Sequence, residues 1–225
     1  MLWHIIQNNT TDGIPYAIIA FCDLAATNAD EILDAHAEFS NLRGIRQIVG
    51  RSPDEDSKST SGRLLDNPIW IENLARLPLR RLSFDLQLIP EQLPAVTEVL
   101  SDIPDLRVAL CHCRSPHDQS EDGLAFWRRE LARLAELPNV FCKLSGFCMF
   151  EQNWNAERVR ATALAAIDNF GVNRRMFRSN FPVEKLYVCY QELYASYPDT
   201  IDSFSDSEKH ALMAGNARQF YRLEN

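Results

Sequence analysis

The sequence has little glycine and lacks the glycine-rich loops that bind phosphates. Its 225 residues include eight glycines, and none of them form the G-x-G-x-x-G pattern of dinucleotide-binding turns. A G-x-S-x-G segment is also missing, which argues against a serine hydrolase of the α/β-hydrolase type. Any catalytic chemistry must therefore come from polar side chains outside these two motifs.

Long apolar runs and an excess of positive charge are missing as well. The longest apolar run, residues 16–21, is too short to span a bilayer and suits a buried strand. The amino terminus has no basic region followed by an apolar stretch, so we expect no secretory signal. The formal net charge of -8 speaks against a nucleic-acid partner, and six cysteines are too few for a disulfide scaffold. We expect a cytoplasmic protein with reduced thiols that binds neither membranes nor nucleic acid.

The sequence does contain a regular alternation of strand-like and helix-like segments. We predict strands over 16–22, 42–50, 81–89, 106–113, 139–147 and 174–180. We predict helices over 28–40, 69–77, 90–103, 123–137, 155–171, 185–197 and 205–221. Repeated βα units indicate a parallel sheet, either an open doubly wound sheet or a (β/α) barrel. An eight-stranded barrel typically needs about 250 residues, so this chain falls short of one.

Polar side chains at the carboxyl ends of the predicted strands are the first candidates for a site, since parallel α/β proteins place their chemistry there. His112 ends the fourth strand, and Arg178 and Asn180 end the sixth. Because side chains alternate along a strand, Arg178 and Asn180 share one face. That arginine either fills the space that a metal or substrate would use or binds a substrate carboxylate.

Further polar pairs lie within the predicted strands. Asp85 and Gln87 share a face, which indicates a barrel interior, and Lys143 and Ser145 share a face of the fifth strand. Lys143 and Ser145 either hold a carboxylate or hydroxyl group of a ligand, or the lysine bonds to strand-end carbonyls. Arg46 either clamps an anion or pairs with Asp85.

Several stretches in order along the chain resemble the amidohydrolase-related TIM-barrel lactonases, such as L-fuconolactonases and 2-pyrone-4,6-dicarboxylate lactonases. These stretches are LRGIRQ (42–47), LRVALCHCRSP (106–116), LPNVFCKLSGF (137–147), RMFRSNFPV (175–183) and AGNARQFYRL (214–223). The resemblance implies a (β/α) TIM barrel of the amidohydrolase type and hydrolysis of a lactone ring. Some members of that family use a divalent metal such as zinc and others do not.

The resemblance also assigns roles to the candidate residues. In the family, an aspartate at the position of Asn180 is the natural base for the attacking water, and a histidine matches His112. Carried onto this chain, the catalytic residues are His112 and Asn180. The substrate-binding residues are Arg46, Asp85, Gln87, Lys143, Ser145 and Arg178. For catalysis, we expect His112 and Asn180 to project from neighbouring strand ends into one shared hollow.

The chain departs from the family pattern in ways that affect the site. The His-x-His pair of the first family strand is absent, Asn180 replaces the aspartate, and Arg178 replaces a glycine. The resemblance begins near residue 2, within the helix after the second family strand. We therefore expect a single domain over 1–225, truncated at its amino terminus, with about six βα units. A homo-oligomer would then cover the open barrel edge, and the metal requirement stays unknown because the His-x-His ligands are absent.

Two functions agree with these residues. The first is a lactonase-like hydrolase whose small-molecule substrate is a sugar lactone or a carboxylated lactone. The alternative is a catalytically impaired or non-catalytic relative that binds a small anion or a partner. The replacement of the aspartate by Asn180 is the feature that separates them, because an amide cannot accept a proton at neutral pH.

Overall fold

The computed structural model describes residues 16–50, 60–112, 118, 120–148 and 154–223. Within these residues, six strands form one sheet in the order β1-β2-β3-β4-β5-β6. Each adjacent pair is parallel. The strands are β1 (Ile18–Phe21), β2 (Leu42–Ile48), β3 (Ser83–Gln87), β4 (Val108–Leu110), β5 (Val140–Leu144) and β6 (Arg175–Phe177). The sheet thus follows the chain order, as in a (β/α) barrel, and the six predicted strands are confirmed, though each is shorter than expected.

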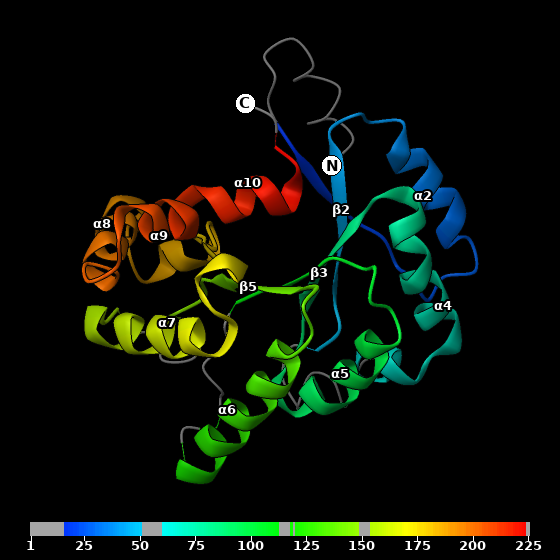
Figure 1. The fold of residues 1–225 in the computed structure, drawn as a ribbon. Helices are drawn as coiled ribbons and strands as arrows, with labels where there is room; N and C mark the ends of the chain where they lie inside the picture. Colours follow the sequence, from blue (N-terminus) through cyan, green and yellow to red (C-terminus); the bar gives the residue numbers. More distant parts are fainter. Residues whose placement is uncertain (1–15, 51–59, 113–117, 119, 149–153, 224–225) are drawn as a thin grey trace.

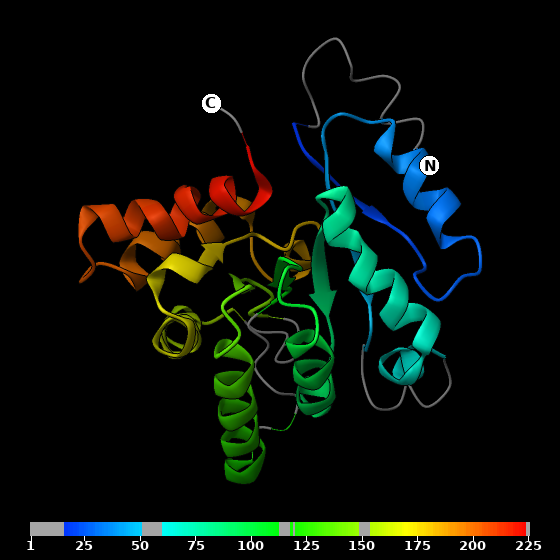
Figure 2. The same ribbon diagram turned by 45° about the vertical axis from the view of Figure 1, so that its right-hand side comes forward.

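Most of the helices between successive strands lie on the outer side of the sheet. The helices among the described residues are α2 (Ala29–Ala37), η1 (Thr60–Asp66), α4 (Pro68–Arg76), η2 (Leu77–Arg80), η3 (Pro90–Gln92), α5 (Leu93–Ser101), α6 (Glu121–Ala135), α7 (Ala156–Phe170), η4 (Val172–Arg174), η5 (Val183–Leu186), α8 (Tyr190–Thr200), α9 (Asp206–His210), η6 (Ala211–Gly215) and α10 (Asn216–Tyr221). Helices α2, α4, α5, α6 and α7 follow one another in an arc around the strands (Figures 1 and 2). This arc is the arrangement expected of successive units of a barrel.

Capping side chains set where several helices begin. The Asn67 side chain accepts from the Ile69 backbone N–H at 2.9 Å ahead of α4. The Ser120 hydroxyl accepts from the Gly123 N–H at 3.1 Å ahead of α6. The segment predicted as one helix over 185–197 divides into η5 and α8, because Cys189 adopts an extended backbone and its sulfur caps α8. A cap residue leaves the helical region of backbone space, so the helix restarts there.

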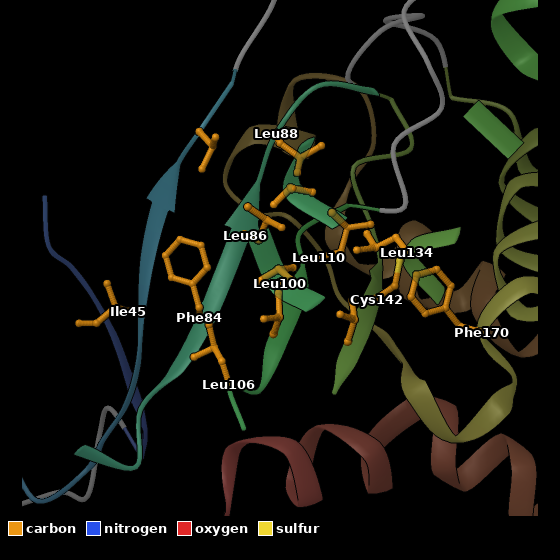
Figure 3. Close-up of a cluster of buried hydrophobic side chains, with 14 of the residues drawn as sticks. Ile45, Phe84, Leu86, Leu88, Leu100, Leu106, Leu110, Leu134, Cys142 and Phe170 are labelled. Atoms are coloured by element: carbon orange, nitrogen blue, oxygen red, sulfur yellow. The ribbon is translucent and has the colours of Figure 1, made fainter. Parts of the chain in front are cut away.

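The main hydrophobic core fills the space between the strands and the outer helices. The buried side chains of Phe84, Leu86, Leu110 and Cys142 point outward from β3, β4 and β5 in this core (Figure 3). The intervening residues of the same strands face the other way, toward the inner side of the sheet. Alternation along the strand therefore separates an apolar outer layer from a more polar interior.

Helix α10 lies on the inner side and closes the amino ends of the strands. The Asn216 amide donates to the Arg175 carbonyl at 2.6 Å, just where β6 begins. The Arg222 guanidinium donates to the Arg81 carbonyl at 2.7 Å, just before β3. Phe220 is fully buried against the inner-facing side chains of β4 and β6. The helix thus forms a floor below the sheet's interior.

No helix among the described residues has the length and apolar character needed to cross a membrane.

Candidate functional site

A cavity of about 330 Å³ lies on the inner side of the sheet, between the strands and α10. We call it the inner hollow. Ile19 and Met176 give it apolar walls from β1 and β6, and Tyr221 and Leu223 reach it from α10 and the residues that follow. Four of the residues predicted to bind substrate also line it, namely Arg46, Asp85, Lys143 and Arg178.

Asp85 and Lys143 form an ion pair in the wall of this hollow. Their side chains are each 2% exposed. The Tyr221 hydroxyl donates to the other Asp85 oxygen at 2.7 Å, and burial followed by the Asp85 charge raises the pKa of Tyr221 well above its ordinary value. Cys111 completes the group, with its sulfur 3.6 Å from the Lys143 nitrogen. A buried charge needs such partners, and Asp85 balances the charge of Lys143 here.

The two arginines of the hollow have no carboxylate partner among the described residues. Arg46 donates to the side-chain oxygen of Gln87 at 2.6 Å. Of the two alternatives for Arg46, the pairing with Asp85 is not seen among the described residues, where Asp85 bonds to Lys143 and Tyr221 instead. Within the described part of the chain, the Arg178 guanidinium makes no hydrogen bond or ion pair. Among the residues that the structure describes, these two positive charges of the hollow therefore have no carboxylate partner, which favours an anionic ligand.

His112 follows β4 and is bonded to the end of the next strand. Its Nδ1 lies 2.9 Å from the Ser145 hydroxyl oxygen, and both residues are 1% exposed. His112 has a left-handed backbone with φ 65°, and Gly146 has φ 74°. A Cβ on Gly146 would lie 2.7 Å from the His112 ring, so only glycine leaves room for the imidazole there. The ring is therefore held in one position by Ser145 and Gly146.

Asn180 follows β6 and is bonded to a carboxylate that the sequence analysis did not single out. Its Nδ2 donates to Glu184 Oε2 at 2.7 Å, and its backbone is left-handed with φ 55°. The other oxygen, Glu184 Oε1, accepts from the Cys148 backbone N–H at 3.0 Å. Glu184 is 1% exposed, and burial raises its pKa, against the lowering effect of the hydrogen bonds from Cys148 and Asn180. The signal that could have found Glu184 is its place one turn after Asn180.

These contacts join the ends of three strands. His112 from β4 bonds to Ser145 after β5, and Glu184 ties the same β5 loop to Asn180 after β6. His112 and Asn180 do not come from neighbouring strands, since β5 lies between β4 and β6. We call His112, Ser145, Asn180 and Glu184 the strand-end cluster.

The eight predicted residues thus divide into two groups. Arg46, Asp85, Lys143 and Arg178 line the inner hollow, and Gln87 is joined to them through Arg46. The described residues lining the hollow do not include His112, Ser145 or Asn180. A shared hollow for His112 and Asn180 therefore stays a prediction.

The donors of the strand-end cluster do not fit a metal site. Among the described residues there is no group of three or more His, Cys, Asp or Glu side chains placed to hold a metal ion. The amide of Asn180 is a poor metal ligand and already donates to Glu184.

A parallel sheet in chain order, helices on its outer side and charged groups within it define a protein of the (β/α)-barrel class. The family model described as amidohydrolase matches residues 8–223, and this chain belongs to that family. This confirms the predicted family. The barrel type of the sheet is also confirmed, because the structural neighbours are amidohydrolase barrel proteins.

The relatives cover most of the chain. The protein y4mH of Sinorhizobium fredii is 35% identical over 212 residues, which is 94% of this chain and 71% of that protein. An L-fucono-1,5-lactonase of Burkholderia ambifaria is 29% identical over 213 residues, covering 92% and 71%. An amidohydrolase of Burkholderia multivorans, crystallised with bound zinc, superposes with a TM-score of 0.85 at 26% identity, covering 99% of this chain and 79% of that one.

Proposed function

We propose that this protein is a lactonase-like hydrolase that binds a small sugar lactone or carboxylated lactone in the inner hollow and opens its ring. The observation that carries the proposal is the pair of guanidinium groups, Arg46 and Arg178, that face one cavity of about 330 Å³ without a carboxylate partner among the described residues. Ligand sites commonly measure about 300–1,000 Å³ and combine apolar walls with a few polar groups. Relatives named as lactonases support the type of reaction.

Ring opening needs a water molecule and a polarised carbonyl group. The water oxygen bonds to the carbonyl carbon, the ring carbon–oxygen bond breaks, and the ring oxygen takes up a proton to leave a hydroxy acid. In this proposal the lactone carbonyl extends from the inner hollow to the strand-end cluster, where His112 polarises the carbonyl oxygen and the Asn180 side-chain oxygen accepts a hydrogen bond from the water. Arg46 and Arg178 hold anionic groups of the substrate. Lys143 shapes the wall of the hollow through its pair with Asp85.

A second candidate is an anion-binding relative without turnover. It is favoured by Asn180, which cannot act as a base and whose amide nitrogen is engaged by Glu184. Loss of a general base typically lowers the rate by about two to four orders of magnitude. Binding in the inner hollow would survive that loss, because Arg46 and Arg178 lie in a different group from Asn180.

One experiment distinguishes the two candidates. The purified chain is incubated with a panel of sugar lactones and carboxylated lactones, with and without zinc or manganese, and acid release is followed by a pH indicator and by NMR. Binding of each hydroxy-acid product is measured by calorimetry in parallel. Turnover that is lost in R46Q and R178Q supports the hydrolase, and binding without turnover supports the second candidate. Neither binding nor turnover with any compound would count against both.

A further inference from the structure

We propose that Glu184 is a positioning residue that sets which way the Asn180 amide points, and that positions 180 and 184 work as one donor–acceptor pair. The inference rests on the proposed function only for what Asn180 does to a water molecule. The pair itself is a direct contact between two described residues.

A tight turn brings the two side chains together. The Asn180 carbonyl accepts from the Val183 N–H at 3.0 Å and from the Glu184 N–H at 3.3 Å. Residues three and four positions apart in such a turn lie side by side. Glu184 therefore reaches back to Asn180 across a single turn, and the left-handed backbone of Asn180 directs its amide into the same space.

The hydrogen bonds of Glu184 determine the orientation of the Asn180 amide. One Glu184 oxygen accepts from the Cys148 N–H and the other from Asn180 Nδ2, so both oxygens act as acceptors, as in a carboxylate. An amide facing a carboxylate must present its NH₂ group. The side-chain oxygen of Asn180 is consequently the atom turned away from Glu184, where it is able to accept a hydrogen bond from water.

Glu184 has a second effect through the β5 loop. Its bond to the Cys148 N–H holds the loop whose first residue, Ser145, contacts the His112 ring. Loss of the carboxylate would release Asn180 and this loop together. A side chain with one acceptor oxygen, such as glutamine, can satisfy Cys148 or Asn180 in the original arrangement, but not both.

This pairing explains why an aspartate at position 180 would fail next to Glu184. In N180D two carboxylates would stand about 2.7 Å apart, and one of them would have to retain a proton. The shared proton would keep the new carboxylate from acting as an ordinary base at neutral pH.

Exchanging the two chemical types would remove the conflict. In N180D/E184Q the glutamine oxygen accepts from Cys148 while its NH₂ group donates to Asp at 180, so every contact is satisfied. In E184Q alone the NH₂ group of glutamine faces Asn180, and the Asn180 amide must turn over. The three variants therefore separate the pair from any general loss of packing.

Thermal unfolding at pH 5 and pH 8 tests the pair without reference to activity. The midpoint of N180D should fall from pH 5 to pH 8 by about 3–8 °C more than that of the unchanged protein, since the folded state holds a proton that the unfolded state releases. N180D/E184Q should lose this extra pH dependence. The titratable group in contact with Glu184, Cys148, has a pKa raised to about 11 and stays neutral over this range.

NMR and a matched control complete the experiment. The side-chain NH₂ signal of Asn180, assigned by its loss in N180D, should shift in E184Q and stay in place in E192Q, which changes an exposed glutamate. N180D/E192Q should behave like N180D. The proposal is overturned if N180D shows the pH dependence of the unchanged protein, or if N180D/E184Q is no more stable than N180D at pH 8.

Hydrolysis is a separate measurement. With a lactone that is turned over, the hydrolysis rate of N180D/E184Q should exceed that of N180D by about tenfold or more. In the double variant the carboxylate at position 180 faces a neutral amide and is free to act as a base. If the double variant regains stability but hydrolyses no lactone, the donor–acceptor pair is supported and the proposed function is contradicted.

Discussion

Lys143 and Asp85 meet inside the barrel, with the lysine nitrogen on one carboxylate oxygen and the Tyr221 hydroxyl on the other. The lysine comes from β5 and the aspartate from β3, so the pair spans β4. Removing one partner leaves the other charge buried, which typically costs about 3–5 kcal/mol. We expect K143M to lower the free energy of unfolding by about that amount. Urea unfolding of K143M and of K143M/D85N measures it, and the double variant should be less destabilised than K143M.

Tyr221 should resist ionisation for as long as the protein is folded. Burial and the Asp85 charge raise its pKa well above the usual value, so the neutral phenol is the form that fits the folded state. Folding therefore favours the protonated group, and this contribution to stability is lost as pH rises above the ordinary tyrosine range of about 10. Ultraviolet titration of the unchanged protein and Y221F should differ by one tyrosine that ionises only on unfolding. An identical titration of the two proteins would contradict the assignment.

Gly146 should be intolerant of even a methyl group. A Cβ there would lie 2.7 Å from the His112 ring, and the backbone has φ 74°, which other residues rarely adopt. We expect G146A to destabilise the protein by about 1–3 kcal/mol. In the H112A background the clash is gone and only the backbone strain remains, so the cost of G146A should be smaller. If G146A lowers the free energy of unfolding equally in both backgrounds, the contact with the His112 ring does not contribute to the destabilisation.

The inner hollow should select anions through its arginines. We expect R178Q to weaken binding of a carboxylated lactone, or of its hydroxy-acid product, by about tenfold or more, since a charge-assisted bond to a carboxylate is lost. R128Q, at an exposed arginine of α6, should leave the affinity unchanged. Calorimetry at two salt concentrations measures both variants. A neutral analogue of the same ligand should bind equally to R178Q and the unchanged protein.

Thiol reactivity should follow burial. Cys189 is exposed, whereas Cys22 and Cys148 are buried with pKa values raised to about 11 by desolvation. Since the thiolate is the reactive form, we expect Cys189 to react with a disulfide reagent at pH 8 and the buried thiols to remain protected. The measurement is made in a C113S background, with C189S as the matched control. Rapid labelling of Cys22 or Cys148 in the folded protein would contradict this expectation.

The sheet could be predicted from the sequence because its signal is local. Each strand carries its own apolar run, and each helix its own periodicity, so the order of elements follows directly from the chain. The partner of Lys143 could not be found in this way. Strand alternation places Lys143 inside the barrel, but it does not say that Asp85, two strands away, lies within reach.

The strand ends were harder to predict because the backbone leaves the regular pattern there. Cys111 still follows the alternation of β4, and its sulfur lies beside Lys143 on the inner side. The left-handed turn at His112 ends the strand geometry at that point. The same applies to Glu184, which reaches Asn180 only because the chain turns after β6. Such turns depend on tertiary packing and give a weak signal in a single sequence.

Helix α10 closes the amino ends of the strands largely through main-chain acceptors. Asn216 donates to the carbonyls of Val172 and Arg175, and Arg222 donates to that of Arg81. Every residue type supplies a carbonyl, so the strand side of this closure depends on the path of the backbone and not on which amino acids occupy it. In random mutagenesis, many residue types at positions 172, 175 and 81 should therefore preserve this closure. Few residue types should preserve it at positions 216 and 222, whose side chains are the donors.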